Sequence, residues 1–380
     1  MFRKILFWAH FAAGALAGIF IFLMSATGLL LTYEAQITEF AVRSAVEAPA
    51  GAAPLDANAM LAAAAAAGAQ PGQTLVLHSD PSVPAEVRAG RSGTRLDPYS
   101  GAPMEEAGAG AEAFFRQVTF LHRWLSVSGP SDTGGAINGA ANLAFLFLVA
   151  SGMYLWLPPV MRWSQVKLRL LLRRGLPTAQ ARHFNWHHVF GAWALVPLFL
   201  VVLSGVVITY PWASNLVFAA AGETAPAGRG AGGGAMPASL ASETLGEAAP
   251  LDADALYAAA GALVPGWKTA ALTLPAADAR YAGFSMDRGN GRQAGLRETL
   301  VIDRETGAAV ARSGAEAQSL GTRLRIWFRF VHTGEVYGIL GQTAAGLACI
   351  AAMMLVYTGF SLGLRRLGRM RRKARARAAA

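Results

Sequence analysis

The chain contains 380 residues, of which 54% are hydrophobic and 15% are charged, and its formal net charge is +10. This composition is too apolar for an ordinary soluble enzyme. Long polar stretches are also present, so the apolar residues must be concentrated in particular segments. Four segments contain uncharged runs longer than the roughly 20 residues with which a helix crosses a membrane. The sequence therefore predicts transmembrane helices in residues 1–33, 133–161, 187–215 and 336–364.

Charged residues are unequally distributed between the segments that these helices connect. Six basic residues lie in the loop 162–186, eight lie in the tail 365–380, and neither segment contains Asp or Glu. All 23 acidic residues fall in segments 34–132 and 216–335. Loops rich in Lys and Arg stay in the cytoplasm. We therefore expect a multi-pass protein of the bacterial inner membrane, with both termini cytoplasmic and two periplasmic segments.

The basic charge and the first apolar run each have another interpretation. A pI of about 10.2 also suits nucleic-acid binding, but the basic clusters adjoin predicted membrane helices, so we expect no nucleic-acid partner. The first run resembles a cleaved secretory signal, yet its apolar stretch is too long for one. The single cysteine, Cys349, lies inside the fourth predicted helix and is expected to be a packing residue.

The two halves of the chain resemble each other. His10 and Gly14 in the first predicted helix correspond to His187 and Gly191 in the third, and a further glycine follows fourteen residues later in both. The second and fourth helices share three glycines with identical intervals: Gly134, Gly139 and Gly152 against Gly341, Gly346 and Gly359. Such matches are the signature of an internal repeat.

The predicted periplasmic segments repeat as well. Asp56 and Asp252 each precede an Ala-rich stretch and are placed to cap a helix. The turns at 97–101 and 303–307 begin with Asp and end with Gly, as hairpin turns do. Residues 221–249 are rich in Gly, Ala and Pro and predict a flexible linker. The predicted fold is an all-α membrane four-helix bundle of two tandem helix–domain–helix repeats, with two small α+β periplasmic domains.

Four of the seven histidines occupy equivalent places in the repeat. His10 and His187 lie near the predicted cytoplasmic ends of the first and third helices, and His122 and His332 lie at the opposite ends of the second and fourth. A single interfacial histidine could merely belong to an aromatic belt. Four imidazoles held out of water at matched positions require a common partner, which a metal-containing group would provide.

Haem suits these histidines better than zinc does. The predicted helices carry no Asp or Glu and one Cys, so a tetrahedral zinc site is difficult to complete. Haem iron needs only two axial nitrogens from facing helices, together with small residues beside the macrocycle. Several glycines in these helices are expected to give that clearance: Gly14, Gly18, Gly191, Gly341 and Gly346.

Short motifs in a fixed order resemble the PepSY-associated transmembrane family over nearly the whole chain. They are Leu121–Leu125, Trp186–His188, Val331–Gly334 and the two Asp-to-Gly turns. Characterised relatives include inner-membrane ferrisiderophore reductases, which carry b-type haems between the helices. The resemblance implies one haem ligated by His10 and His187 on the cytoplasmic side, and a second ligated by His122 and His332 on the periplasmic side.

The remaining histidines and two tyrosines are assigned other roles. His188 is the alternative to His187, although a helix points adjacent side chains about 100° apart. His183, in the basic loop, is expected to contact a haem propionate or a lipid phosphate, and His78 to be an ordinary surface residue. Tyr33 and Tyr210 are expected to anchor helices at the membrane interface.

These observations lead to one main hypothesis. The chain is a di-haem b electron-transfer protein of the inner membrane, in contact with lipid, that passes electrons from a separate donor, a quinol or a cytosolic reductase, to a periplasmic ferric complex. A ferric siderophore reductase of iron uptake has this activity. The alternative is a non-enzymatic PepSY regulatory or peptide-binding membrane protein without haem. A transporter is less favoured, because the predicted helices lack charged residues beyond their ends.

The charge distribution predicts the outcome of reporter fusions. A fusion after Gly175, in the basic loop, should report a cytoplasmic location, whereas fusions after Gly90 or Gly289 should report a periplasmic one. Paired alkaline phosphatase and fluorescent-protein reporters measure this directly. A periplasmic signal at Gly175 would contradict the four-helix topology.

Overall fold

The computed structural model describes residues 1–90, 92–226 and 238–378, which form two compact units. The helical unit comprises Met1–Glu34, Phe114–Val217 and Trp327–Ala380, and the α/β unit comprises Ala35–Ala113 and Phe218–Ile326. Residues 227–237 of the predicted linker lie outside the described residues.

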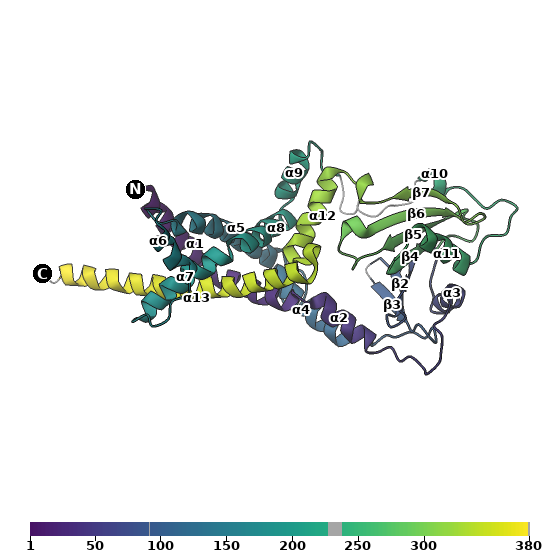
Figure 1. The fold of residues 1–380 in the computed structure, drawn as a ribbon, viewed down its shortest axis with the longest axis horizontal. Coiled ribbons are helices and arrows are strands. Elements are labelled where there is room, and N and C mark those ends of the chain that lie inside the picture. The colour runs from purple at the N-terminus through teal and green to yellow at the C-terminus, as the bar shows by residue number, and fades with distance from the viewer. Residues whose placement is uncertain (91, 227–237, 379–380) are drawn as a thin grey trace. The chain divides into compact units, whose positions relative to one another are not determined.

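The helical unit is formed around the longest apolar helices. α1 (Phe2–Leu31) packs against α5 (Asp132–Trp156) and α13 (Gly338–Ala378), as Figure 1 shows. α7 (Ala179–Trp193) packs mainly on α13, whereas α8 (Leu195–Thr209) packs on α5 and α13. The shorter helices that contribute to this unit are α4 (Ala109–Trp124), α6 (Trp163–Leu170), α9 (Pro211–Ala220) and α12 (Leu320–Thr333).

The third predicted membrane helix, 187–215, is not a single straight helix. α7 and α8 meet at a bend of 67°. The break precedes Pro197, which has no N–H to donate to the carbonyl of Trp193 and is tolerated only in the first turn of a helix. Among the described residues, three helices are long and apolar enough to cross a membrane, or four if the bent pair counts as one span.

The second and fourth predicted helices also differ in extent. α5 ends at Trp156 rather than at 161, because Pro158 and Pro159 follow and prolines cannot continue a helix. Two guanidinium groups satisfy the last carbonyls of α5: Arg3 donates to Leu155 and Leu157, and Arg169 donates to Trp156. α13 continues to Ala378, so the basic segment 365–380 is largely helical rather than a separate tail.

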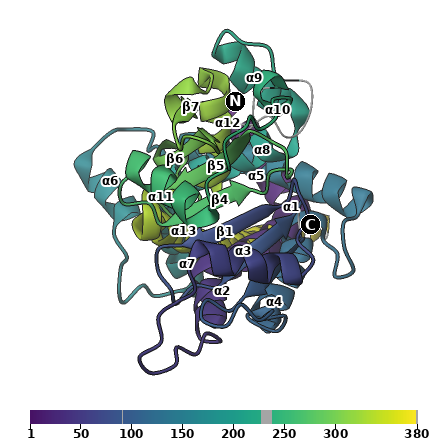
Figure 2. The same ribbon diagram turned by 90° about the vertical axis from the view of Figure 1, so that its right-hand side faces the viewer.

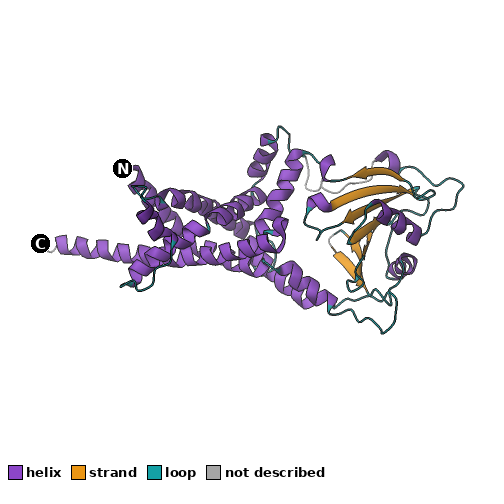
Figure 3. Ribbon diagram, in the orientation of Figure 1, coloured by secondary structure: helices purple, strands orange, loops and turns teal. Residues whose placement is uncertain are grey.

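The strands of the α/β unit form one sheet, which corrects the prediction of two separate small domains. All neighbouring strands are antiparallel, in the order β3-β2-β1-β4-β5-β6-β7. The strands are β1 (Thr74–His78), β2 (Ala85–Ala89), β3 (Ser92–Leu96), β4 (Thr269–Thr273), β5 (Tyr281–Asp287), β6 (Arg297–Asp303) and β7 (Ala309–Ser313). β1 and β4 pair with Leu75 opposite Leu272 and thereby join the two segments (Figure 3).

Two Ala-rich helices, α3 (Ala57–Ala66) and α11 (Ala253–Leu263), lie side by side on one face of the sheet (Figure 2). Small side chains let both helices approach the sheet, and one continuous core includes buried residues of both segments, such as Leu75 and Phe284. The predicted caps are present, because Asp56 accepts a hydrogen bond from Ala59 N and Asp252 accepts one from Ala255 N.

The N-termini of α3 and α11 also cap each other. Asp254 accepts a hydrogen bond of 2.7 Å from the backbone N–H of Ala57, and Asn58 accepts one of 2.8 Å from the N–H of Ala253. Each helix therefore satisfies a free N–H group of the other. The predicted turns are present as well: Gly101 and Gly307 have φ of +72° and +73°, a conformation that glycine adopts without strain.

This reciprocal capping predicts the effect of Asp254→Ala. The substitution leaves the N–H of Ala57 without its carboxylate acceptor, so the free energy of unfolding should fall by about 1–2 kcal/mol. Thermal unfolding of the purified protein, followed by circular dichroism in the region of sheet absorption, measures the loss. The exposed Asp278 gives the matched control, and equal destabilisation by Asp278→Ala would refute the capping role of Asp254.

Candidate functional site

Each of the four matched histidines contacts a hydroxyl group of another helix. In all four contacts the imidazole uses Nδ1. The distances are 2.8 Å from His10 to Ser151 Oγ, 2.9 Å from His187 to Thr358 Oγ1, 2.9 Å from His122 to Thr27 Oγ1 and 3.2 Å from His332 to Ser204 Oγ. The same type of contact, from Nδ1 to a hydroxyl group of another helix, therefore occurs at all four histidines.

The hydroxyl groups determine which nitrogen carries the proton. Thr27, Ser151 and Thr358 each donate their own hydrogen to the carbonyl four residues earlier in their helix, at 2.6–2.7 Å. Since a hydroxyl has one hydrogen, each of these oxygens can only accept from its histidine. Nδ1 is then the protonated nitrogen, and Nε2 keeps its lone pair.

His332 reaches the same state through a second acceptor. Its Nδ1 lies 2.8 Å from the carbonyl oxygen of Val201, which can only accept a hydrogen bond. Ser204 donates to that same carbonyl at 2.8 Å. All four histidines thus present an unprotonated Nε2, which is the nitrogen that a metal ion binds when the other ring nitrogen is held by an acceptor.

A glycine follows each hydroxyl residue and lets the imidazole approach the helix. Cβ atoms built on these glycines would lie 3.3–3.5 Å from Cε1 of the histidine: Gly28 against His122, Gly152 against His10, Gly205 against His332 and Gly359 against His187. A methyl group at these positions would already touch the imidazole, so a larger side chain would push the ring away. The glycines matched between the two halves of the sequence therefore fit histidine rings.

The histidines form two pairs at opposite ends of the helical unit. The ring centres of His122 and His332 are 6.3 Å apart, and His10 and His187 bond to Ser151 and Thr358 at the other end of the helical unit. Two imidazoles bonded to one metal ion at about 2 Å each place their ring centres roughly 6 Å apart. Along α1, the seventeen residues from His10 to Thr27 correspond to about 25 Å, most of the ~30 Å thickness of a hydrocarbon core.

The five glycines expected to flank a macrocycle instead contact the protein. Gly14 faces Leu148, Gly18 faces the ring of Phe360, and Gly191 faces Leu355. The last two lie beside backbone or a small side chain: Gly341 beside the carbonyl of Gly334, and Gly346 beside Thr32. Their role in the structure is close helix packing. The side chains that face Gly14, Gly18 and Gly191 belong to two leucines and a phenylalanine, and these side chains can rotate.

The other histidines differ from these four. His188 donates from Nδ1 to the carbonyl of Phe184 in its own helix, and it points away from the pair formed by His10 and His187 into a hollow beside α6. His183 is buried, bonds to Ser361 Oγ at 2.7 Å and packs against Tyr357, so its Nδ1 already has a partner within the protein.

His78 is not an ordinary exposed residue. It lies half-buried on β1 with Nδ1 3.3 Å from Thr269 Oγ1. Burial, together with the nearby Arg88, lowers the pKa of His78. Among the predicted interface residues, Tyr33 bonds to Thr343 at 2.8 Å. Cys349 packs beside Gly28, as expected of a packing residue.

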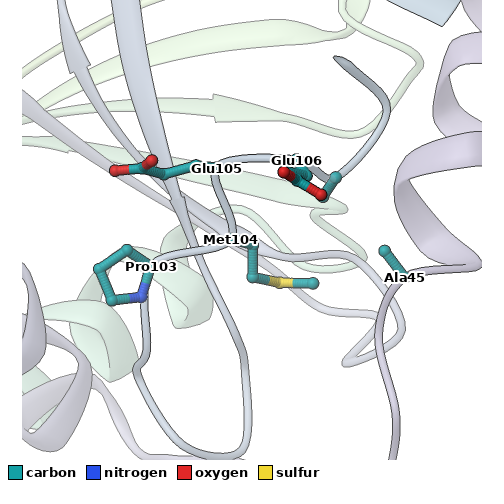
Figure 4. A pocket seen from close by; sticks show the side chains of 6 residues that line it. Ala45, Pro103, Met104, Glu105 and Glu106 are labelled. Carbon is teal, nitrogen blue, oxygen red and sulfur yellow. The ribbon is translucent and has the colours of Figure 1, made fainter. Parts of the chain in front are cut away.

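A hollow of about 530 Å³ lies in the α/β unit and is lined by Ala45 and the loop from Pro103 to Ala107. Figure 4 shows the carboxylates of Glu105 and Glu106 on this loop, next to Met104. No histidine is among its lining residues, and both glutamates are exposed. The predicted site residues therefore belong to the helical unit and not to this hollow.

The hydroxyl residues were not predicted from the sequence. A signal for them exists, because each glycine that receives an imidazole is preceded by Ser or Thr: Thr27-Gly28, Ser151-Gly152, Ser204-Gly205 and Thr358-Gly359. Each of α1, α5, α8 and α13 carries one Ser/Thr-Gly pair that receives an imidazole. Only the structure shows which histidine each pair receives.

Comparison with known proteins agrees with this architecture. The family described as "PepSY-associated TM region" matches residues 7–366, nearly the whole chain. No curated protein matches the chain significantly. The match includes the four Ser/Thr-Gly pairs and the four histidines that they hold. This multi-pass membrane protein belongs to the PepSY-associated transmembrane family.

Proposed function

We propose that this protein is a di-haem b electron-transfer protein that carries electrons across the bacterial inner membrane to a ferric complex, as a ferric siderophore reductase does. The observation that carries the proposal is the shared state of His10, His187, His122 and His332. All four have Nδ1 held by an acceptor and Nε2 free, at two places about 25 Å apart along the helical unit.

The donor set fits haem iron. Two neutral imidazoles per site supply the two axial nitrogens that a b-type haem requires, and the separation of 6.3 Å between His122 and His332 suits ligation of a single ion. The chain has no Cys-x-x-Cys-His sequence, so attachment would be non-covalent. When bound, each haem supplies a one-electron ferric–ferrous couple.

The protein's own residues orient the ligands and keep water away. Thr27, Ser151, Ser204 and Thr358 fix the tautomer and the direction of each ring, and hydrogen bonding at Nδ1 raises the basicity of Nε2. All four hydroxyl residues are at most 4% exposed.

The direction of transfer follows from the proposed topology. The start of α1, the helix α6 and the end of α13 lie at the same end of the helical unit (Figure 1). This end is rich in Arg and Lys and would face the cytoplasm. No soluble cytoplasmic domain would fit in the loop 162–186, so the donor would be a separate quinol or reductase. The acidic α/β unit would lie in the periplasm with the ferric acceptor. Reduction of the ferric iron would weaken its binding by the hard oxygen ligands of the chelator.

The proposal predicts which variants lose which haem. His10→Ala or His187→Ala should remove one haem, and His122→Ala or His332→Ala should remove the other, so that each single variant retains about one of two b-type haems. Pyridine haemochrome analysis and the Soret absorption of purified protein measure this. In each variant, dithionite should still reduce the remaining haem, whereas electron delivery from the physiological donor should stop.

His188→Ala is the discriminating variant. It should retain both haems, because His188 is turned away from the pair. If His188→Ala loses a haem and His187→Ala does not, the assignment of His187 is wrong. Colourless wild-type protein from haem-replete cells would refute the proposal and favour the non-enzymatic PepSY module.

The hydroxyl contacts give an independent prediction. Thr358→Val keeps the shape of the side chain but removes the acceptor for His187 Nδ1, so the affinity for one haem should fall about tenfold or more. Haem loss to apomyoglobin and electron paramagnetic resonance of the low-spin iron measure the change. Thr32→Val is the matched control, since Thr32 is buried and its hydroxyl donates to the carbonyl of Gly28 in its own helix. Equal haem loss from the control would contradict a specific role for Thr358.

A further inference from the structure

A second hollow, of about 400 Å³, lies between α6 and the first half of α7. Its size is within the range of small-molecule sites. The polar lining includes Arg169, Arg173, Gln165 and His188, and the apolar lining includes Leu168 and Phe184. None of the four matched histidines is among its lining residues.

The charge of this hollow is positive and uncompensated. The whole segment 162–186 contains no Asp or Glu, and no carboxylate pairs with Arg169 or Arg173 in the described part of the chain. Burial and the nearby Arg3 lower the pKa of Arg169. The N-terminus of α7, capped by Thr178, adds the partial positive charge of a helix dipole. An anion would stabilise this arrangement.

The walls of the hollow are rigid. The buried side chain of Asn185 donates to the carbonyls of Leu168 and Leu171, at 3.2 and 3.0 Å, and accepts from the N–H of Arg173 at 3.0 Å. These bonds fix α6 and the following loop against α7. The side chain of Arg173 is left exposed at the mouth, where it can bind a phosphate through its planar guanidinium group.

His188 favours a ligand that carries a hydroxyl group. Its Nδ1 donates to the carbonyl of Phe184 at 2.8 Å, and its ring lies against the ring of Phe184 with centres 4.1 Å apart. Nε2 therefore has a lone pair and accepts hydrogen bonds. A ligand for this hollow carries a phosphate for the two arginines and a hydroxyl for His188.

Exposed apolar side chains on α6 and on the loop that follows it, outside the lining of the hollow, indicate that this ligand is a lipid. Trp163 is 72% exposed, Leu172 58% and Leu171 49%. Exposed tryptophan and leucine beside arginine are typical of a helix at the membrane surface, where the apolar side chains enter the acyl region. Basic pockets in this position bind anionic headgroups.

We propose that the hollow between α6 and α7 is a binding site for the headgroup of an anionic phospholipid with free hydroxyls, phosphatidylglycerol. Arg169, Arg173 and the N-terminus of α7 hold the phosphodiester, and His188 Nε2 accepts from the glycerol. The site does not depend on the cofactor of the paired histidines. This site gives a role to His188, which is not one of the four histidines at equivalent places in the repeat.

The test titrates lipid into the full-length protein in neutral detergent and follows bound lipid by native mass spectrometry. Wild-type protein should bind one phosphatidylglycerol saturably in preference to phosphatidylcholine. Arg173→Gln should weaken this binding about fivefold, as expected for one basic contact at a membrane surface. Arg173→Lys should retain part of the affinity, and His188→Phe should reduce the preference for a glycerol headgroup.

Arg174→Gln is the matched control, because Arg174 is the adjacent exposed arginine and does not line the hollow. Its phosphatidylglycerol affinity should stay at the wild-type value. Equal weakening by Arg174→Gln would show general charge attraction and overturn the proposal. Equal binding of phosphatidylcholine, or displacement of lipid by inorganic phosphate at the same concentration, would also overturn it. Native circular dichroism of Arg173→Gln excludes misfolding as the cause of any loss.

Discussion

The arrangement of the helical unit depends on the need to satisfy imidazole groups inside apolar helices. A buried polar group without a partner costs roughly 1–3 kcal/mol, and the four matched histidines are each partly buried in this unit. A hydroxyl from a neighbouring helix meets that need each time, at 2.8–3.2 Å. The same bonds connect α1 with α5, α7 with α13, α4 with α1 and α12 with α8. The same four hydrogen bonds therefore satisfy the histidines and join the helices.

This constraint explains features of the backbone. Each imidazole lies against a glycine of the neighbouring helix, where a side chain larger than a methyl group would displace the ring: Gly28, Gly152, Gly205 and Gly359. The bend of 67° before Pro197 changes the direction of the chain between His187 in α7 and Ser204 in α8. These two residues serve opposite ends of the helical unit, His187 bonding to Thr358 and Ser204 to His332. α7 and α8 can then pack against α13 and α5 separately.

The α/β unit has a different organising contact, the pairing of β1 with β4. A sheet of three or four short strands with one helix has two exposed edges and a small core. Pairing along Leu75 and Leu272 removes one edge from each segment and allows α3 and α11 to share a core and to cap each other. The two segments are thus complementary, and residues 35–113 would leave apolar surface exposed without residues 218–326.

The sequence by itself determined that the chain has long apolar helices, that its charges are separated between segments and that Asp56 and Asp252 cap two helices, because hydrophobicity, charge and local turn chemistry are properties of short segments. It did not determine the single sheet or the mutual capping by Asp254 and Asn58, since residues about 200 positions apart have no local signal. The prediction extended helices past the prolines at 158, 159 and 197, where the structure ends or bends them, and the size of a bend depends on packing. The tautomer of each histidine was likewise decided only in three dimensions, where Thr27, Ser151, Ser204 and Thr358 meet imidazoles from other helices and leave Nε2 free.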